Sequence, residues 1–286
     1  MKLATFEYQG KTGIGMVRED GVVRLDDVAP SMLALIDAGQ PHWDAARERG
    51  QSARGAIPLD EVKLLAPIPR PRKNIFALGR NYGEHAKESA AARGEAVTPP
   101  VIFTKVTTSV NAPFGELVVD PEVSVQVDWE VELAVIIGKK ARKIHRMNAL
   151  EYVFGYTVLN DVTARDLQNR TPQFFVGKSI DGYCPMGPWI VTADEIGDPQ
   201  KLDLTCKVNG VVKQHGNTSD MIYTVAYMIE DLSRMMTLEP GDILTTGTPA
   251  GVGFARKPPE FLKPGDVLES EVEKIGALRN PVTGAK

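Results

Sequence analysis

Paired carboxylates near the middle of the chain could hold a divalent cation. In residues 126–133, apolar side chains alternate with Asp128, Glu130 and Glu132, so these three acids would share one face of a strand. The strand continues into the apolar stretch 134–137 and is predicted to be buried on both faces. Buried carboxylates need a positive partner, and a hard cation is one. The alternation alone also allows a half-exposed strand whose acidic face lies in water.

A further carboxylate, Asp161, ends another apolar segment at residues 154–160. A site built only from the oxygens of Glu130, Glu132, Asp161 and water would suit Mg²⁺ or Mn²⁺ better than Zn²⁺. Taken alone, Asp161 could instead cap the N-terminus of a helix over residues 162–167. The residues leave both interpretations open.

A histidine and a glutamate are spaced to meet on one face of a helix. His85 and Glu88 are three residues apart, which places their side chains side by side on a helix. A carboxylate next to an imidazole orients the ring and raises its basicity, as a general base for activating water requires. The spacing alone also fits an incidental pair on a surface helix.

Other reactive patterns are absent from the sequence. The glycine-rich segment 247–253 lacks the Lys-Ser/Thr pair of a phosphate-binding loop, and we expect it to line a small ligand. The sequence contains no Gly-x-Ser-x-Gly motif, which disfavours a hydrolase with a serine nucleophile. Cys184 and Cys206 both lie in apolar surroundings, and we expect them to be structural.

The elements that must position these residues are mostly strands. Residues 2–8, 13–18 and 22–25 are predicted strands, followed by helices over 32–36, capped by Ser31, and 42–49. Three prolines in residues 66–72 indicate an extended connector, so we divide the chain into domains at 1–70 and 71–286. The later part contains one clear long helix, over 221–236. Its β-type segments are 74–78, 101–105, 125–137, 153–159, 188–191, 204–208, 243–246 and 267–272.

Length and composition limit the function classes. The 286 residues carry a net charge of −4, which provides no basic excess for nucleic acid. We expect the one basic run, at residues 139–146, to be a solvated turn after a buried strand, so it does not indicate a lipid surface. Two cysteines form no disulfide framework, and the N-terminus lacks the apolar stretch of a signal peptide. We therefore expect a cytoplasmic protein without membrane or nucleic-acid partners.

The motifs, taken in order, resemble the fumarylacetoacetate hydrolase family. They are Gly-Arg-Asn-Tyr-x-x-His-x-x-Glu at 79–88, Glu-x-Glu at 130–132, Asn-Asp-x-Thr-Ala-Arg-Asp-x-Gln at 160–168, Gly-Lys at 177–178 and Thr-Gly-Thr-Pro-x-Gly-Val-Gly at 246–253. The resemblance implies a β-dominated α+β fold, in which a twisted mixed β-roll forms the catalytic domain beside a small β-rich N-terminal domain. It also implies a homodimer.

The resemblance assigns a role to each motif residue. The ligands of Mg²⁺ or Mn²⁺ would be Glu130, Glu132 and Asp161. The catalytic residues would be His85, Glu88 and Lys178, with the His85–Glu88 pair activating water. The substrate-binding residues would be Arg80, Tyr82, Arg165, Gln168, Lys178 and Thr248.

The chemistry implied by the resemblance is enolate stabilisation on a small 2-oxo acid. Our first expectation is hydrolysis of the C3–C4 bond of a 2,4-dioxo acid of the acylpyruvate type, which releases pyruvate and a carboxylic acid. Decarboxylation of an oxaloacetate-type acid and tautomerisation of a 2-oxo acid would use the same residues. A non-catalytic module that binds an oxo acid is the alternative from another class, but metal binding alone would not need both His85 and Glu88.

Overall fold

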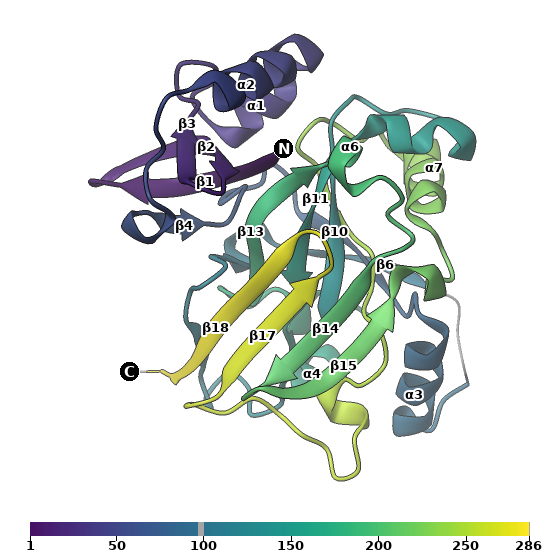
Figure 1. The fold of residues 1–286 in the computed structure, drawn as a ribbon. Coiled ribbons are helices and arrows are strands. Elements are labelled where there is room, and N and C mark those ends of the chain that lie inside the picture. Colours follow the sequence, from purple (N-terminus) through teal and green to yellow (C-terminus); the bar gives the residue numbers. More distant parts are fainter. Residues whose placement is uncertain (97–99, 286) are drawn as a thin grey trace.

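Strands carry most of the fold in the computed structural model, which describes residues 1–96 and 100–285. The β-dominated α+β fold predicted from the sequence is confirmed, with several sheets and fewer helices (Figure 1). Within the described residues, eleven strands form the large sheet in the order β3-β2-β1-β13-β11-β10-β16-β5-β6, with β4 beside β1 and β7 beside β13. The sheet is mixed, because β16 and β5 are parallel whereas most neighbours are antiparallel.

The large sheet takes strands from the whole length of the chain. They are β1 (Lys2–Tyr8), β2 (Lys11–Arg18), β3 (Gly21–Arg24), β4 (Lys63–Leu65), β5 (Ile75–Gly79), β6 (Val101–Lys105), β7 (Val110–Asn111), β10 (Val131–Ile137), β11 (Val153–Asn160), β13 (Cys184–Thr192) and β16 (Ile243–Thr245). Because β1 pairs with β13, the N-terminal strands continue the sheet that carries the later motifs. The division into domains at residues 70 and 71 stays a prediction.

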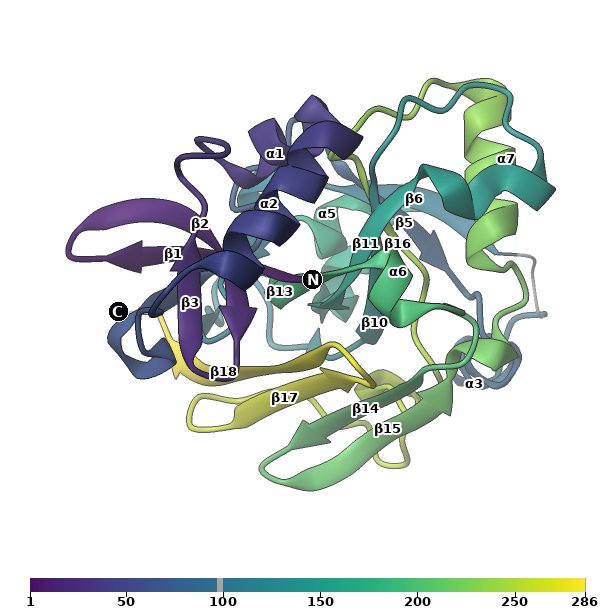
Figure 2. The ribbon, with the colours of Figure 1, turned by 45° about the horizontal axis from the view of Figure 1, so that its top comes forward.

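A second sheet packs against the face of the large one (Figures 1 and 2). Its order is β15-β14-β17-β18-β8, and a separate pair joins β12 to β9. These strands are β8 (Leu117–Val119), β14 (Asp203–Val208), β15 (Val211–Asn217), β17 (Val267–Val272), β18 (Gly276–Gly284), β9 (Val127–Asp128) and β12 (Thr163–Ala164). The sequence did not reveal β15 or β18, since their exposed and polar positions weaken the apolar pattern.

Strand β10 is buried on both faces, as the sequence predicts. Leu133 and Val135 belong to the core between the two sheets, whereas Ala134 and Ile136 belong to the core under the N-terminal helices. Successive side chains of a strand point to opposite faces, so one strand supplies both cores. The carboxylates at the beginning of this strand are thereby fixed to the most rigid part of the molecule.

The predicted single strand over 125–137 is wrong at one point, because it breaks between β9 and β10. The backbone N–H of Glu130 donates to Asn160 Oδ1 at 3.0 Å, and that of Val131 donates to Gln214 Oε1 at 3.1 Å. Side chains therefore take the place of a neighbouring strand at this point. As a result Asp128 lies outside the cluster of Glu130, Glu132 and Asp161, although it shares Arg165 with Glu130.

Helices lie mainly around the sheets. They are α1 (Met32–Ala38), α2 (Gln40–Ser52), α3 (Gly83–Arg93), α4 (Arg165–Gln168), α5 (Phe175–Lys178), α6 (Ala193–Ile196) and α7 (Val225–Met235), with 3₁₀ turns at Leu59–Glu61, Thr107–Ser109, Arg146–Tyr152, Thr218–Asp220 and Gly253–Ala255. The Ser31 side chain accepts a hydrogen bond from the Ala34 N–H, as expected of an N-cap. Helix α7 begins at Val225, later than predicted, because Thr224 caps it.

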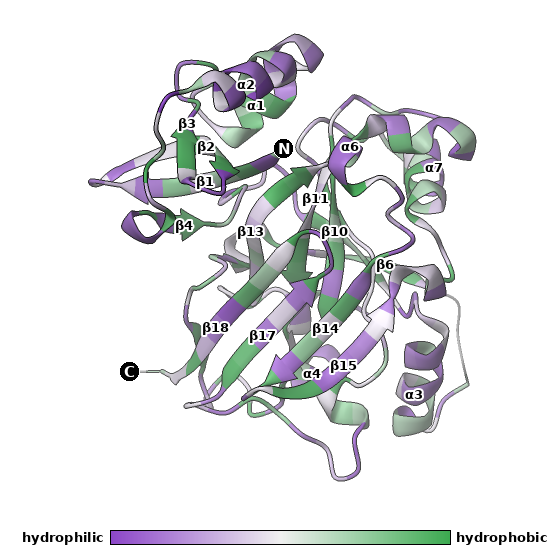
Figure 3. Ribbon diagram, in the orientation of Figure 1, coloured by the Kyte–Doolittle hydropathy of each residue, from purple (hydrophilic) through white to green (hydrophobic). Residues whose placement is uncertain are grey.

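Helix α3 carries the His85–Glu88 spacing and is mainly hydrophilic in Figure 3. It buries His85, Ala86, Ser89 and Ala90 along one face, so small and polar side chains make its contact with the body of the protein. Among the described residues, no helix is both long enough and apolar enough to cross a membrane.

Candidate active site

Three buried carboxylates converge at the beginning of β10 and the end of β11. Glu130, Glu132 and Asp161 each offer an oxygen, and these oxygens lie within 4.8 Å of one another. All three side chains are buried, which excludes the half-exposed acidic face that the alternation allowed. The ladder between β10 and β11 brings them together, because Val131 lies opposite Asn160.

Asp161 is not a helix cap. Its oxygens accept from two fully buried lysines, at 2.6 Å from Lys105 Nζ and 2.7 Å from Lys178 Nζ. The turn that follows, α4, begins only at Arg165 and has no side-chain cap. The helix expected over residues 162–167 is therefore replaced by β12 and a short turn.

Positive side chains compensate two of the three carboxylates. Lys178 Nζ also lies 2.7 Å from Glu130 Oε2, so one ammonium bridges Glu130 and Asp161. Burial alone would raise the pKa of Glu130, but the charges of Lys178 and Arg165 hold it well below its usual value. Burial also opposes the charge on Lys178, yet the adjacent carboxylates keep its pKa above the usual value.

Glu132 has no such partner. Its Oε2 accepts from the backbone N–H of Gly247 at 2.8 Å and from the hydroxyl of Thr245, and both donors are neutral. Burial and the charges of Asp161 and Glu130 raise the pKa of Glu132 well above its usual value. Glu130, Glu132 and Asp161 are matched in number by Lys105, Lys178 and Arg165, but among the described residues none of these cations lies at ion-pair distance from Glu132.

This arrangement fits a hard divalent cation. The donor set is made of carboxylate oxygens only, and a bound cation would supply Glu132 with the positive partner that it lacks among the described residues. Glu130, Glu132 and Asp161 would hold the ion, with water or substrate at the remaining positions. Mg²⁺ and Mn²⁺ both prefer oxygen ligands, so either ion would suit this donor set.

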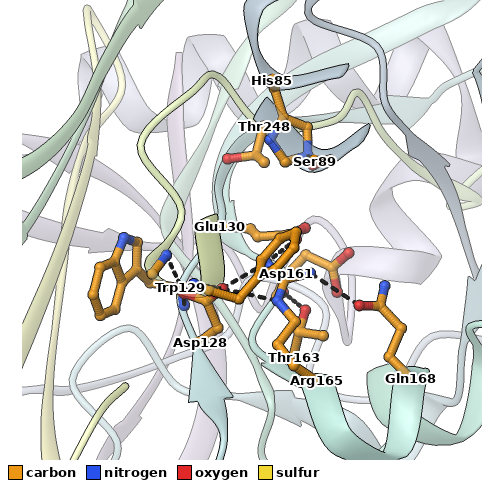
Figure 4. A network of polar contacts seen from close by, with 12 residues as sticks. His85, Ser89, Asp128, Trp129, Glu130, Asp161, Thr163, Arg165, Gln168 and Thr248 are labelled. Atoms are coloured by element: carbon orange, nitrogen blue, oxygen red, sulfur yellow. Dashed lines mark hydrogen bonds and ion pairs between the residues drawn. The ribbon is translucent and has the colours of Figure 1, made fainter. Parts of the chain in front are cut away.

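The His85–Glu88 pair faces this cluster across a narrow pocket. In Figure 4, His85 and Ser89 lie on one side of the site, and Glu130 and Asp161 on the other. His85 Nδ1 lies 2.9 Å from Glu88 Oε1. The carboxylate of Glu88 is itself held by the Gly251 N–H at 3.0 Å. Because His85 is buried against the pocket, the pair is not an incidental surface contact.

A glutamate that accepts from Nδ1 leaves the other ring nitrogen of His85 as an acceptor. That nitrogen, Nε2, lies 3.5 Å from Ser89 Oγ, and His85 and Ser89 both line the pocket. The arrangement can therefore take up a proton from a molecule bound there.

Most of the predicted substrate-binding residues line the same pocket. They are Arg80, Arg165, Gln168, Lys178 and Thr248. Tyr82 is different: among the described residues it is fully buried, and its hydroxyl has no hydrogen-bond partner and does not line the pocket. Burial raises the pKa of the Tyr82 hydroxyl, so it stays protonated.

Arg165 is positioned by Asp128, which the alternation placed on the same strand face as Glu130 and Glu132. Its Nε donates to Asp128 Oδ2 at 2.8 Å, and Asp128 is fixed by the N–H groups of Gly253 and Phe254. Arg165 Nη1 donates to Gln168 Oε1 at 3.0 Å. Arg165 Nη2 lies 2.8 Å from Asp128 Oδ2 and 2.6 Å from Glu130 Oε1, so one guanidinium links these two carboxylates at the wall of the pocket.

Sequence reasoning missed two buried residues of the site. Lys105 is the last residue of β6 and forms an ion pair with Asp161. A lysine at the end of an apolar strand could have indicated a buried, paired charge. Gln214 donates to Thr248 Oγ1 at 2.7 Å and comes from β15, which the sequence did not reveal. No motif pointed to Gln214.

Comparison with known proteins gives the same picture for nearly the whole chain. Residues 74–283 match the family model described as fumarylacetoacetate (FAA) hydrolase C-terminal, and residues 1–67 match the model described as Rv2993c-like, N-terminal. Oxaloacetate tautomerase YisK from Bacillus subtilis (strain 168) is 41% identical over 304 residues, covering 99% of this chain and 100% of the relative.

Two solved structures share the fold at lower identity. Maleylpyruvate hydrolase from Sphingobium sp. SYK-6, in complex with manganese(II) ion and pyruvate, has a TM-score of 0.81 and 30% identity, with both chains covered to 100%. The 2-hydroxyhepta-2,4-diene-1,7-dioate isomerase from Mycobacterium marinum has a TM-score of 0.76 and 31% identity, covering 99% of this chain and 98% of that one. Proteins similar to this chain thus carry the names of a tautomerase, a hydrolase and an isomerase.

Proposed function

Because this chain belongs to the fumarylacetoacetate hydrolase family, whose members are enzymes, we propose that it enolises a small 2-oxo acid, with keto–enol interconversion of oxaloacetate as its main reaction. The observation that carries this proposal is the His85–Glu88 pair facing the buried carboxylate cluster across one pocket. The similarity to an oxaloacetate tautomerase along 99% of the chain supports oxaloacetate as the substrate.

A divalent cation held by Glu130, Glu132 and Asp161 would supply Lewis-acid stabilisation of the negative charge that develops on the 2-oxo oxygen. The protein's own cations complement it. Arg165 and Gln168 offer donors that can hold the substrate's C1 carboxylate. Lys178 remains protonated beside Glu130 and Asp161, so it can give a proton to the 2-oxo oxygen.

His85 would then move the proton at C3. Its Nδ1 is engaged by Glu88, and its Nε2 can remove a hydrogen from C3 of the bound acid. Loss of that proton and protonation of the 2-oxo oxygen convert the keto form into the enol. In the reverse direction His85 gives a proton to C3 while Lys178 takes the proton of the enol oxygen. Exchange with water resets both residues after either direction, so the two forms interconvert with no net change in atoms.

Hydrolysis of a 2,4-dioxo acid is the second candidate, and it was our first expectation. The same His85–Glu88 pair supports it, because the pair can activate water as well as remove a proton from carbon. Water would add to the C4 carbonyl, the C3–C4 bond would break, and C3 would take a proton. The products would be pyruvate and a carboxylic acid. Similarity to a maleylpyruvate hydrolase supports this candidate.

One panel of assays distinguishes four possibilities: tautomerisation, hydrolysis, decarboxylation of oxaloacetate, and binding without catalysis. The enzyme is assayed with Mg²⁺ or Mn²⁺ and with a chelator, on enol oxaloacetate, keto oxaloacetate and an acylpyruvate. Faster loss of the enol's ultraviolet absorbance without pyruvate release supports the tautomerase. Pyruvate with a carboxylic acid from the acylpyruvate supports the hydrolase, and pyruvate with CO₂ from oxaloacetate supports the decarboxylase. Absence of metal-dependent conversion of every compound would reject the enzyme proposal and leave the binding module.

A further inference from the structure

Beyond the inner pocket lies a larger and positively charged vestibule. The inner pocket is narrow, with a volume of about 20 Å³, whereas the vestibule has a volume of about 760 Å³. The two adjoin, since both are lined by Arg80, Arg93, Gln168 and Phe174. The charged residues among those that line the vestibule are Arg80, Arg93, Arg170 and Glu95. A vestibule lined by three arginines and one glutamate favours an anion.

Arg93, at the end of α3, is the residue that joins the two spaces. Its guanidinium lies 5.7 Å from the ring centroid of Phe174 and 5.5 Å from that of Phe254. Two aromatic rings thus restrict its orientation and shield it from water. Burial lowers the pKa of Arg93, and the neighbouring charges of Arg165 and Arg80 lower it further.

The donors of Arg93 are only partly used. Its Nη2 donates to Gln168 Oε1 at 3.3 Å, a long contact, and its buried Nε has no hydrogen-bond partner among the described residues. Within the same part of the chain, no carboxylate lies at ion-pair distance from Arg93, whereas Glu95 lies 3.8 Å from Arg80. Arg93 is half-buried, and a cation in that position with a buried, unused Nε and like-charged neighbours is costly unless a ligand supplies the counter-charge.

Arg93 also contacts Gln168, one of the two residues that would hold the C1 carboxylate of the substrate. Contacts run from Glu130 to Arg165 at 2.6 Å, from Arg165 to Gln168 at 3.0 Å and from Gln168 to Arg93 at 3.3 Å. A short acid bound at the carboxylate cluster would therefore direct its far end toward Arg93.

We propose that Arg93 binds a second carboxylate of the substrate, so that the enzyme prefers dicarboxylic 2-oxo acids to 2-oxo acids with an uncharged far end. This inference rests on the proposed function, since it assumes that a 2-oxo acid occupies the inner pocket. Arg93 acts here as a specificity-determining residue, and it takes no part in the proton transfer.

The test compares pairs of acids that differ only in the far carboxylate. Exchange of the C3 hydrogens for deuterium is followed by NMR for oxaloacetate and for 2-oxobutanoate, with Mn²⁺ present. Arg93→Gln should lower kcat/KM for oxaloacetate by about ten- to a hundredfold, the factor that corresponds to losing hydrogen bonds to a charged group. The kcat/KM for 2-oxobutanoate should not change. Arg93→Lys, which keeps the charge, should recover part of the loss. Arg54→Gln, at an exposed arginine far from this site in sequence, is the matched control and should leave both rates at the wild-type value.

A binding measurement keeps the inference independent of turnover. Malate and 2-hydroxybutanoate form the same kind of pair, and neither contains the oxo group needed to react. In calorimetric titrations of the Mn²⁺-loaded protein, Arg93→Gln should weaken the binding of malate by about tenfold or more. The affinity for 2-hydroxybutanoate should not change. If the wild type turns over no 2-oxo acid, the proposed function fails, but this titration still decides the role of Arg93.

Two outcomes would overturn the inference. Equal loss for both members of a pair would mean that Arg93 merely positions Gln168. No loss for either member, with thermal unfolding showing an intact variant, would mean that Arg93 is only part of the vestibule wall.

Discussion

At the scale of single residues, the site separates proton transfer from charge compensation. His85 and Glu88 lie on α3 and touch none of the buried lysines, whereas Glu130 and Asp161 are tied to Lys178. Replacing His85 or Glu88 should therefore lower activity and leave stability unchanged. Replacing Glu130 or Asp161 should lower both activity and stability. Two predictions follow this separation.

We predict that His85→Ala lowers the rate of enolisation or hydrolysis by about a hundred- to ten-thousandfold, the range for a lost general base. Glu88→Gln should lower the rate by a similar or smaller factor, because Glu88 only orients the imidazole. The double variant should be little worse than His85→Ala, since both residues serve one proton transfer. Steady-state kinetics and thermal unfolding measure the two effects.

The matched control for this pair is Glu84→Gln. Glu84 is on the same helix but is exposed and pairs with Lys87 at 2.7 Å, so its loss should leave the rate unchanged. Near-normal turnover by His85→Ala would leave the His85–Glu88 pair without a catalytic role.

The carboxylate cluster makes a prediction about metal affinity. Glu132→Gln should weaken Mn²⁺ binding strongly, because it removes a proposed ligand. The loss of affinity should exceed the roughly 10- to 100-fold loss that is typical when a residue that only supports a ligand is replaced. The metal-free variant should be as stable as the wild type or more so, because Glu132 has no cationic partner and its charge is repelled by Asp161 and Glu130. Calorimetric Mn²⁺ titration and thermal unfolding of the metal-free protein provide the readouts.

Asp161→Asn provides the contrast. It should lose metal affinity too, but it leaves Lys105 and Lys178 short of a carboxylate, so stability should fall by about 3 kcal/mol. Asp60→Asn, at an exposed site, should change neither quantity. Full Mn²⁺ affinity in Glu132→Gln would contradict the proposed ligand set.

At the scale of elements, the strands decide which reactive groups are available. Cys184 lies in β13 and Cys206 in β14, and both are fully buried within the sheets. The expectation that they are structural is consistent with this position. Burial raises the pKa of the Cys184 thiol to about 12 and shifts that of Cys206 in the same direction.

We predict that the native protein is inert to thiol reagents at pH 8. A raised pKa keeps the reactive thiolate scarce at that pH, and burial blocks access. A colorimetric thiol assay should detect both cysteines after unfolding in guanidinium and almost none before. Rapid labelling of the folded protein would show that β13 or β14 opens under native conditions.

At the scale of the whole molecule, the two sheets hold a rigid centre between them while α3 brings polar groups from the side (Figure 2). The core on either face of β10 fixes Glu130 and Glu132, and β11 fixes Asp161. The catalytic pair comes from a separate helix with a small buried face. The molecule thus joins a buried carboxylate cluster to a histidine–glutamate pair on a helix with a small buried face.

The homodimer implied by the family resemblance remains a prediction. Light scattering coupled to size-exclusion chromatography should give twice the chain mass of 31.2 kDa at micromolar concentration. The Mn²⁺-loaded and chelator-treated proteins should give the same mass, because the metal ligands are buried within one chain. A monomer mass under these conditions would reject the dimer.

The sequence alone determined the types of element and the motif residues. The continuous apolar run at residues 134–137 predicted that β10 is buried on both faces, and the Ser31 cap and Gly39 marked the ends of α1. These features are local, since side-chain direction and capping depend on residues a few positions apart. The order of the motifs identified the family for the same reason, because each motif is read within a short stretch.

Tertiary structure decided how the acidic residues divide their roles. Alternation placed Asp128, Glu130 and Glu132 on one face. The strand is interrupted where Asn160 and Gln214 accept its N–H groups, and Asp128 lies outside the carboxylate cluster, where it binds Arg165. Lys105 and Arg93 likewise acquire roles only from what packs beside them: Asp161 lies 56 residues from Lys105 in sequence, and Gln168 lies 75 from Arg93. Charge balance in a buried site depends on such distant contacts, because low polarity makes every unpaired charge costly, and no local pattern contains that information.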